Sequence, residues 1–167
     1  MKETLQESFL SFKESVKTLH LSTLTEEGKP NASYAPYVAG QLEGDQGSFY
    51  IFVSQLASHT QDLLSNPETS ILLMQDESST RQIFARRRLS YQCFVEIVQG
   101  TEPGYNINMD ALEARFGNVV TVLRGLPDFI LFRLKPYKGQ YVMGFGKAYK
   151  LTGETLLELE HINPQKS

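Results

Sequence analysis

The sequence predicts an α+β protein, mainly antiparallel β, whose sheet is long enough to curl into a barrel. Three observations support this fold class: a helical pattern precedes the first strand, the strands are irregularly spaced, and helical segments stand between pairs of strands. The chain has 167 residues, of which 41% are hydrophobic and 21% charged, so it can build one sizeable core. We therefore expect a single domain over 1–167, with a helix at 1–17 and a tail at 153–167.

The first helix is predicted over residues 3–16, because apolar side chains recur there at helical spacing. The stretch 18–38 then predicts the hairpin around which the sheet is organised, with a polar turn at 26–30. Pro36 in the second arm cannot donate to a strand ladder, which places that arm at a sheet edge or a bulge. The apolar positions of the helix are Leu5, Phe9, Phe12 and Val16.

Strands and helices then follow one another along the chain. Residues 49–53 are a short apolar run typical of a buried strand that ends at Ser54. Ser58 and Gln61 have the spacing of a capping box, which predicts a helix that stops at Asn66-Pro67. The later predictions are a strand covered on both faces over 69–75, a short helix over 79–85, an alternating strand over 86–98, a helix over 110–124, and strands over 128–135 and 140–151 joined by a turn at 136–139.

Charge and cysteine content exclude several classes of protein. A net charge of -3 and a pI near 5.6 argue against binding to the nucleic-acid backbone, which selects basic surfaces. Cys93 is the one cysteine, so neither an intramolecular disulfide nor a zinc-type cysteine cluster can form. Acidic residues interrupt the first twenty positions, and no apolar run approaches the ~18 residues of a membrane span. We expect a reduced, soluble, cytoplasmic protein with no nucleic-acid or membrane partner.

Two groups of side chains are candidates for holding an anion. Ser54, Ser58 and His59 stand where a strand gives way to a helix, whose free backbone N–H groups attract phosphate or carboxylate. Alternatively, Ser58 only caps the helix and His59 is exposed to solvent. Arg86 and Arg88 leave one face of a strand as a two-cation patch able to hold a dianion, or they are a solvated strand start that prevents edge aggregation.

Other polar side chains predict structural roles. Arg87 leaves the same strand on the core-side face, so it is expected to snorkel or to pair with a carboxylate. His20 alternates with leucines and is interpreted as structural. Cys93 lies on an apolar strand face where a thiolate would be costly, and the chain has no GxSxG or HExxH motif. Any chemistry is therefore expected to come from a bound cofactor.

Short motifs in a fixed order over nearly the whole chain carry a resemblance to a known family. Together they resemble the haem-utilisation branch of the pyridoxamine 5'-phosphate oxidase-like family. The resemblance implies a split β-barrel that forms a homodimer with a cofactor in a cleft between the subunits. That cofactor is FMN in the wider family and haem in the haem branch, some of whose members degrade haem to release iron. The motifs are SYAPYV at 33–38, SxxxSH at 54–59 with an LxxNP stop at 63–67, FARRRL at 84–89, LPDFILFRLKP at 126–136 and GFGKAY at 144–149.

Departures from the flavin-binding relatives argue against tight FMN binding. Those relatives grip the FMN phosphate with an arginine and a lysine on the second hairpin arm, where this chain has Ser33 and Val38. His59 stands where the same relatives have a phosphate-binding lysine. Two lost charge-assisted contacts, at roughly 1.5–3 kcal/mol each, would weaken FMN binding by orders of magnitude. In the resembled family the position of Arg88 faces the cofactor.

The C-terminal tail only partly matches the haem branch. Members of that branch end in two histidines, the later of which is the axial iron ligand, supported by an aspartate on a late strand. Asp128 matches the aspartate and His161 the first histidine, but Lys166 stands where the second should fall. A lysine ligates iron only when deprotonated, so His161 becomes the candidate axial ligand, unless it lies in a loose tail.

Three functional hypotheses follow. In the first, a homodimer binds haem, Arg88 and the turn at Ser58 and His59 hold its propionates, and His161 binds the iron. If that protein is an enzyme, the iron activates oxygen against the porphyrin, and Asp128 orients the proximal histidine or a water. The second hypothesis is an FMN-binding oxidoreductase of the same fold. The third is a haem-storage dimer without turnover.

Overall fold

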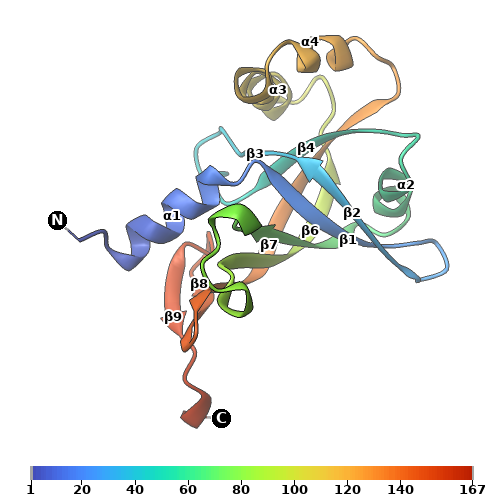
Figure 1. The fold of residues 1–167 in the computed structure, drawn as a ribbon. Coiled ribbons are helices and arrows are strands. Elements are labelled where there is room, and N and C mark those ends of the chain that lie inside the picture. The colour runs from blue at the N-terminus through green and yellow to red at the C-terminus, as the bar shows by residue number, and fades with distance from the viewer. Residues whose placement is uncertain (1, 167) are drawn as a thin grey trace.

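The computed structural model describes residues 2–166, which form a curled antiparallel sheet with helices around it (Figure 1). The paired path runs β2-β1-β5-β6-β7-β4-β3, and β8 and β9 continue from β7. This architecture confirms the predicted α+β class and the split-barrel fold. The strands are β1 (Thr18–Leu24), β2 (Pro30–Pro36), β3 (Val38–Ala39), β4 (Phe49–Ser54), β5 (Glu68–Met74), β6 (Arg88–Ile97), β7 (Phe129–Gly144), β8 (Lys147–Thr152) and β9 (Glu158–His161).

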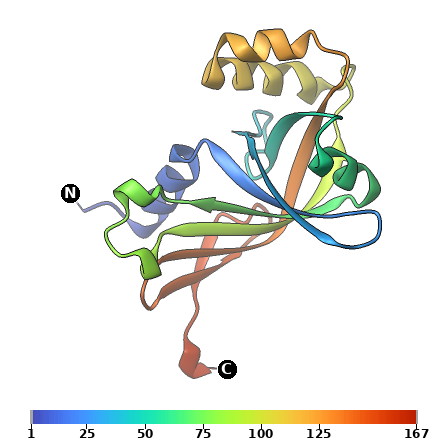
Figure 2. The same ribbon diagram turned by 45° about the vertical axis from the view of Figure 1, so that its right-hand side comes forward.

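The helices lie at different edges of the sheet. The pair α3 and α4 stands together at the end where β6 finishes and β7 begins, and α1 lies at another edge (Figures 1 and 2). Within residues 2–166, no helix is long and apolar enough to cross a membrane. The helices are α1 (Leu5–Ser15), α2 (Ser58–Ser65), α3 (Pro103–Phe116) and α4 (Asn118–Arg124), with short 3-10 turns η1 (Glu77–Ser79), η2 (Ile83–Ala85) and η3 (Pro164–Lys166).

Helix α1 forms where the apolar spacing predicted it. Thr4 caps its first turn, and Glu7 completes a capping box by accepting from the Thr4 backbone N–H at 2.8 Å. Phe9 and Phe12 on the inner side of the helix are almost fully buried in the main core. Burying each phenylalanine stabilises the fold by about 1.5–3 kcal/mol, which fixes α1 against the sheet.

The predicted hairpin is also confirmed. Strands β1 and β2 pair from Thr18 opposite Pro36 to Leu24 opposite Pro30, and β2 ends the paired path of the sheet. Pro36 therefore lies on an edge strand, as its missing N–H requires.

One face of the sheet is buried and the other is uncovered in this chain. On β5, Ile71 and Leu73 are buried, whereas Ser70 is exposed and Leu72 is half-buried. The prediction that this strand is covered on both faces is therefore wrong for the single chain, because Glu68 and Ser70 on its outer side are exposed. We name this uncovered side the open face. Its members in register are Tyr34, His20, Ser22, Ser70, Leu72, Met74, Arg88 and Ser90.

The turn predicted at 136–139 is wrong, because β7 runs through it without a break. Pro136 pairs with Cys93 where the register of β6 shifts, and this irregularity accommodates the missing N–H. At Gly139 a Cβ atom would lie 2.6 Å from the Leu151 side chain and 2.8 Å from the Tyr91 ring. Gly139 therefore allows close packing within the sheet, and the chain reverses only after β7 ends.

The last part of the chain and the long helix also differ from the prediction. The tail at 153–167 contains strand β9, which pairs with β8 from Thr152 opposite Glu158 to Tyr149 opposite His161. The helix predicted over 110–124 begins earlier and is divided at Gly117, whose φ of 85° ends α3. A second, smaller core lies below α3 and α4, apart from the main core inside the curled sheet.

Candidate functional site

One group of predicted site residues lies where β4 ends and β7 begins. The Ser54 hydroxyl donates to Oδ2 of Asp128 at 2.6 Å, and the Gln55 backbone N–H donates to the Asp128 carbonyl at 2.7 Å. The Ser54 oxygen in turn accepts from the Leu56 N–H at 3.1 Å. Asp128 thus ties the two strand ends together, a pairing that the sequence patterns did not indicate.

The capping box predicted at Ser58 is wrong. Ala57 is the N-cap of α2, and no side chain caps the helix. Ser58 is already inside the first turn, where its hydroxyl accepts from the Asn31 amide at 3.2 Å. Asn31 also donates to Asp62 at 2.8 Å, and the buried Thr23 hydroxyl donates to the same carboxylate oxygen at 2.7 Å. These bonds fasten α2 to the hairpin and turn Ser58 towards β2.

His59 and Ser33 bind each other. Nδ1 of His59 lies 3.0 Å from the Ser33 hydroxyl, and the ring is half-buried. Burial lowers the pKa of His59, while the Asp62 carboxylate acts in the opposite direction. A neutral imidazole is therefore favoured at neutral pH, so this pair offers no permanent cation to a phosphate group.

Arg86 and Arg88 differ in how far their donors are already used. Nε of Arg86 donates to the Gln75 carbonyl at 2.6 Å, and Nη1 forms an ion pair with Glu77 at 3.3 Å. Arg88 lies on the open face opposite Met74, and within residues 2–166 its guanidinium makes one hydrogen bond, to the Arg86 carbonyl at 3.1 Å. Arg88 is therefore the one of the two with a charge available to a ligand.

Arg87 lies on the core side, as its position in the alternation predicts. Its Nε donates to the Tyr141 hydroxyl at 2.6 Å, and Nη2 donates to the Ser8 hydroxyl at 2.7 Å. The guanidinium carbon stands 4.6 Å from the centroid of the Phe12 ring. Of the two expected alternatives, pairing with a carboxylate does not occur, because the acceptors in the described part of the chain are hydroxyl and carbonyl oxygens. Arg87 joins α1 to the sheet.

His161 is held in place on the edge strand β9. Its Nε2 lies 2.8 Å from the Gly146 carbonyl oxygen, and its ring meets Tyr149 edge to face with centroids 5.4 Å apart. An open cavity of about 480 Å³ lies beside it, lined by Lys150, Glu160, His161, Ile162 and Asn163. Two exposed apolar side chains lie next in sequence to these residues: Phe145 precedes Gly146 in the β7–β8 turn, and Ile162 follows His161. The side chain of Lys166 lies outside the described residues.

The predicted site residues thus form two groups at opposite ends of β7. Ser54 pairs with Phe129 at its start, whereas Arg88 pairs with Val142 near its end. A strand advances about 3.3 Å per residue, so these 13 residues correspond to roughly 40 Å if extended. Within one chain, Asp128 and His161 are therefore not brought together.

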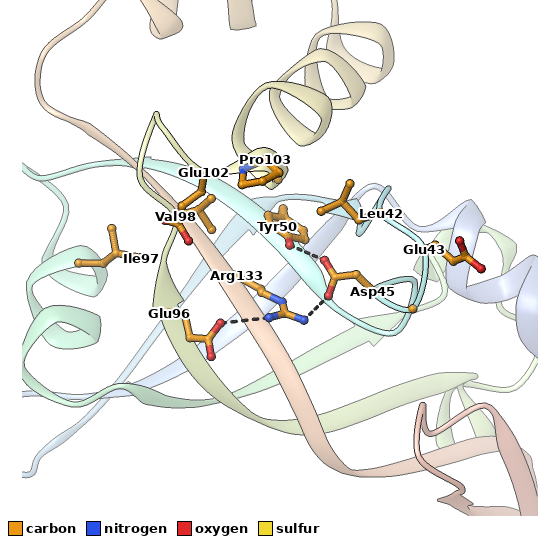
Figure 3. Close-up of a pocket in the computed structure, with 12 residues that line it drawn as sticks. Leu42, Glu43, Asp45, Tyr50, Glu96, Ile97, Val98, Glu102, Pro103 and Arg133 are labelled. Carbon is orange, nitrogen blue, oxygen red and sulfur yellow. Dashed lines mark hydrogen bonds and ion pairs between the residues drawn. The ribbon is translucent and has the colours of Figure 1, made fainter.

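A further polar cluster, which the sequence patterns did not indicate, lines a cavity of about 360 Å³ near the start of α3 (Figure 3). Arg133 stands between two carboxylates there, 3.2 Å from Glu96 and in contact with the buried Asp45. Tyr50 donates to Asp45, and burial together with that carboxylate raises the pKa of Tyr50. Because the arginine charge is already matched, the cluster fastens the 40–48 loop to β7. No group of three or more metal-ligating side chains occurs within residues 2–166.

Comparisons with known proteins agree on one family. The family model described as pyridoxamine 5'-phosphate oxidase matches residues 5–143. Heme oxygenase HutZ of Vibrio cholerae serotype O1 is 36% identical over 158 residues, covering 95% of this chain and 87% of that protein. The crystal structure of HutZ, called there a heme storage protein from Vibrio cholerae, superposes with a TM-score of 0.76 at 33% identity over 89% of this chain and 96% of that one. Campylobacter jejuni ChuZ gives a TM-score of 0.82 at 27% identity over 98% and 65%.

Proposed function

Because the chain belongs to the pyridoxamine 5'-phosphate oxidase family, in the haem-utilisation branch that includes HutZ, we propose that it binds haem between the subunits of a homodimer. The observation that carries this proposal is the setting of His161. A held imidazole stands beside a cavity and next to exposed apolar side chains, Phe145 and Ile162. An axial nitrogen and apolar surface are what haem requires.

The same residues fit FMN less well. Ser33 and His59 occupy positions that would have to grip a phosphate, yet they bind each other, and burial favours the neutral form of His59. Val38 is almost fully buried in the second core and offers no donor. The flavin alternative would depend on Arg88 for phosphate binding, without the further cations that a tight phosphate site normally has.

A homodimer is supported by the open face. It places the half-buried Leu72 and Met74 and the exposed Tyr34 beside polar groups on one sheet surface. Such mixed surfaces are commonly covered by a second copy in a twofold arrangement. In an antiparallel pairing of two copies, the Asp128 end of one chain would face the His161 end of the other. The two groups of site residues would then form one composite site.

Within that site the chain's own residues have separable tasks. Arg88 would hold a propionate, because its charge has no carboxylate partner in the described part of the chain. His161 would bind the haem iron through an imidazole nitrogen. Bound haem would supply the oxygen-activating iron chemistry of an oxygenase. The Asp128 carboxylate, which already accepts a hydrogen bond from the Ser54 hydroxyl at 2.6 Å, would orient the His161 ring of the other subunit or a water.

Spectral titration of the purified protein with haem, and separately with FMN, tests the proposal. We expect haem to bind at micromolar concentration or tighter, FMN to bind more weakly, and His161→Ala to change the Soret band and the spin state. Glu158→Ala on the same strand is the matched control and should leave the spectrum unchanged. Micromolar or tighter FMN binding, together with an unaltered haem spectrum in His161→Ala, would overturn the haem proposal in favour of a flavin oxidoreductase.

Turnover needs its own measurement, because HutZ is named both a heme oxygenase and a heme storage protein. We propose the oxygenase activity, on the strength of the 36% identity to the protein that bears that name. Adding a reductant and oxygen to the haem complex should bleach the Soret band and release iron that a chelator can trap. A stable Soret band under those conditions would instead assign storage.

A further inference from the structure

A cavity away from both groups of site residues lies between α1, the segment after β2, and α3. Its volume is about 320 Å³, at the small end of the 300–1,000 Å³ typical of ligand sites. Leu10 and Leu157 provide apolar walls, and Lys13 and Arg115 provide two cations. The cavity adjoins the α1 side of the sheet, whereas Arg88 lies on the open face.

Lys13 is a buried charge with few partners. The residue is only 6% exposed, and within residues 2–166 its ammonium makes one hydrogen bond, to the Gln46 carbonyl at 3.3 Å. It also stands 4.9 Å from the centroid of the Phe49 ring. An ammonium has three donors, so two remain for a ligand, and no carboxylate of the described chain forms an ion pair with it. Burying a charge without such a partner is costly.

Arg115 adds a second positive charge whose partners are neutral. Its guanidinium donates to the carbonyls of Tyr37 at 3.0 Å, Glu14 at 2.9 Å and Val16 at 2.8 Å. These bonds satisfy the free carbonyl acceptors of Glu14 and Val16 at the end of α1, but carbonyl oxygens carry no formal charge. The Glu14 carboxylate at the rim is exposed and raises the pKa of Lys13, against the larger lowering by burial to about 8. With one rim carboxylate set against two cations, the cavity has an excess of positive charge.

We propose that this cavity binds a small amphipathic carboxylate, whose charged end is held by Lys13 and whose aliphatic body packs against Leu10 and Leu157. A carboxylate supplies the counterion that the buried ammonium lacks. Arg115 attracts the carboxylate by its positive charge rather than by hydrogen bonds, since most of its donors already bond to backbone carbonyls. The apolar walls favour a ligand with a hydrocarbon body over a bare ion. The cavity volume suits a medium-chain fatty acid. The proposal does not depend on haem binding.

Calorimetric titration with octanoate tests it, with two probes that each lack one half of the ligand. Octanoate should bind at pH 7 at least tenfold more tightly than octanol, which has the body without the charge, and than acetate, which has the charge without the body. Lys13→Met should weaken octanoate at least tenfold. Lys29→Met, an exposed lysine in the hairpin turn, should not change it.

Arg88→Ala distinguishes this cavity from the proposed haem site. If octanoate binds there instead, Arg88→Ala will weaken it while Lys13→Met leaves it unchanged, and the inference fails. Equal affinity for octanol and octanoate would also overturn it. A second readout uses the wild type alone: octanoate should protect Lys13 from acetylation, measured by mass spectrometry, and undiminished labelling of Lys13 at saturating octanoate would count against the site.

Discussion

Arg87 and Arg88 are neighbours in the chain, yet their guanidinium groups lie on opposite sides of the sheet. Arg87 donates to Tyr141 and Ser8 on the core side and covers the Phe12 ring, whereas Arg88 stands on the open face with one backbone contact. Two like charges at successive positions therefore have unlike tasks: one fastens α1 to the sheet, and the other is available to an anionic ligand.

Replacing the two arginines one at a time should show that Arg87 contributes to stability and Arg88 to haem binding. Arg87→Ala loses its bonds to Tyr141 and Ser8 and should cost roughly 2–4 kcal/mol of unfolding free energy, or about 5–15 °C in Tm. Arg88→Ala should change stability by less than about 0.5 kcal/mol but weaken haem binding about tenfold or more, because a charge-assisted hydrogen bond is lost. Thermal unfolding and a haem titration at fixed salt measure the two effects. If Arg87→Ala and Arg88→Ala lost the same haem affinity, the total positive charge of the protein, and not the position of Arg88, would be responsible for haem binding.

Asp128→Asn should shift the haem spectrum in the same direction as His161→Ala but less far, because a carboxylate beside a ligand raises its basicity without touching iron. The amide keeps an oxygen for the Ser54 hydroxyl, so stability should fall by only about 1 kcal/mol. Ser54→Ala is the control, since it removes that hydrogen bond and keeps the charge. A spectrum that responds equally to both variants would assign Asp128 a purely structural role.

A charge placed on the open face should separate the proposed dimer. Leu72→Asp puts a carboxylate on the half-buried centre of that face, whereas Val122→Asp puts one on α4, where the side chain is 66% exposed. We expect sedimentation of a dimer for the wild type and Val122→Asp, and of a monomer with weakened haem binding for Leu72→Asp. A wild type that sediments as a monomer at micromolar concentration would refute the dimer and the composite site with it.

Lys13 predicts a specific pH dependence of stability. Its folded pKa of about 8 lies below the ordinary 10.5, so below pH 8 both states are protonated and the burial penalty is fully present. Between the two values the unfolded chain holds more protons, and stability rises with pH. Lys13→Met should therefore be more stable than the wild type by about 1–3 kcal/mol at pH 7, with the difference shrinking towards pH 10.5. Urea unfolding of both proteins at several pH values measures the difference in stability, and a difference that stays constant between pH 7 and pH 10.5 would contradict the prediction.

The sequence predicted best where one local rule governs one element. The alternation predicted over 86–98 placed Arg87 and Arg88 on the correct faces, and the turn chemistry at 26–30 located the hairpin. The prediction failed at 136–139, where a proline and a glycine favour a turn locally. Pairing with β6 along this segment, and with β8 from Gly139 onward, keeps the strand extended. Gly139 is explained by the Tyr91 and Leu151 side chains that pack over it, which are remote in sequence.

The sequence indicated individual candidate site residues, but not which of them contact one another in the fold. The bond from Ser54 to Asp128 joins positions 74 residues apart, and the contact of Arg133 with Asp45 spans 88. Lys13 gave no signal at all, because a lysine on an amphipathic helix normally faces solvent, whereas here it bonds to the Gln46 carbonyl of the 40–48 loop and lies against the Phe49 ring. Contacts of this kind depend on how the sheet curls, which no local pattern records.

The length of β7 has a consequence for which changes of sequence the fold can tolerate. Successive side chains on a strand alternate between faces, so inserting or deleting one residue between Phe129 and Val142 would exchange inward and outward positions beyond that point. It would also offset the ladder to β6 and β8, and alter the spacing between Asp128 and the Arg88 end of the sheet. Length variation among natural variants of this chain should therefore fall in the 40–48 and 76–82 loops, and β7 should keep a constant number of residues.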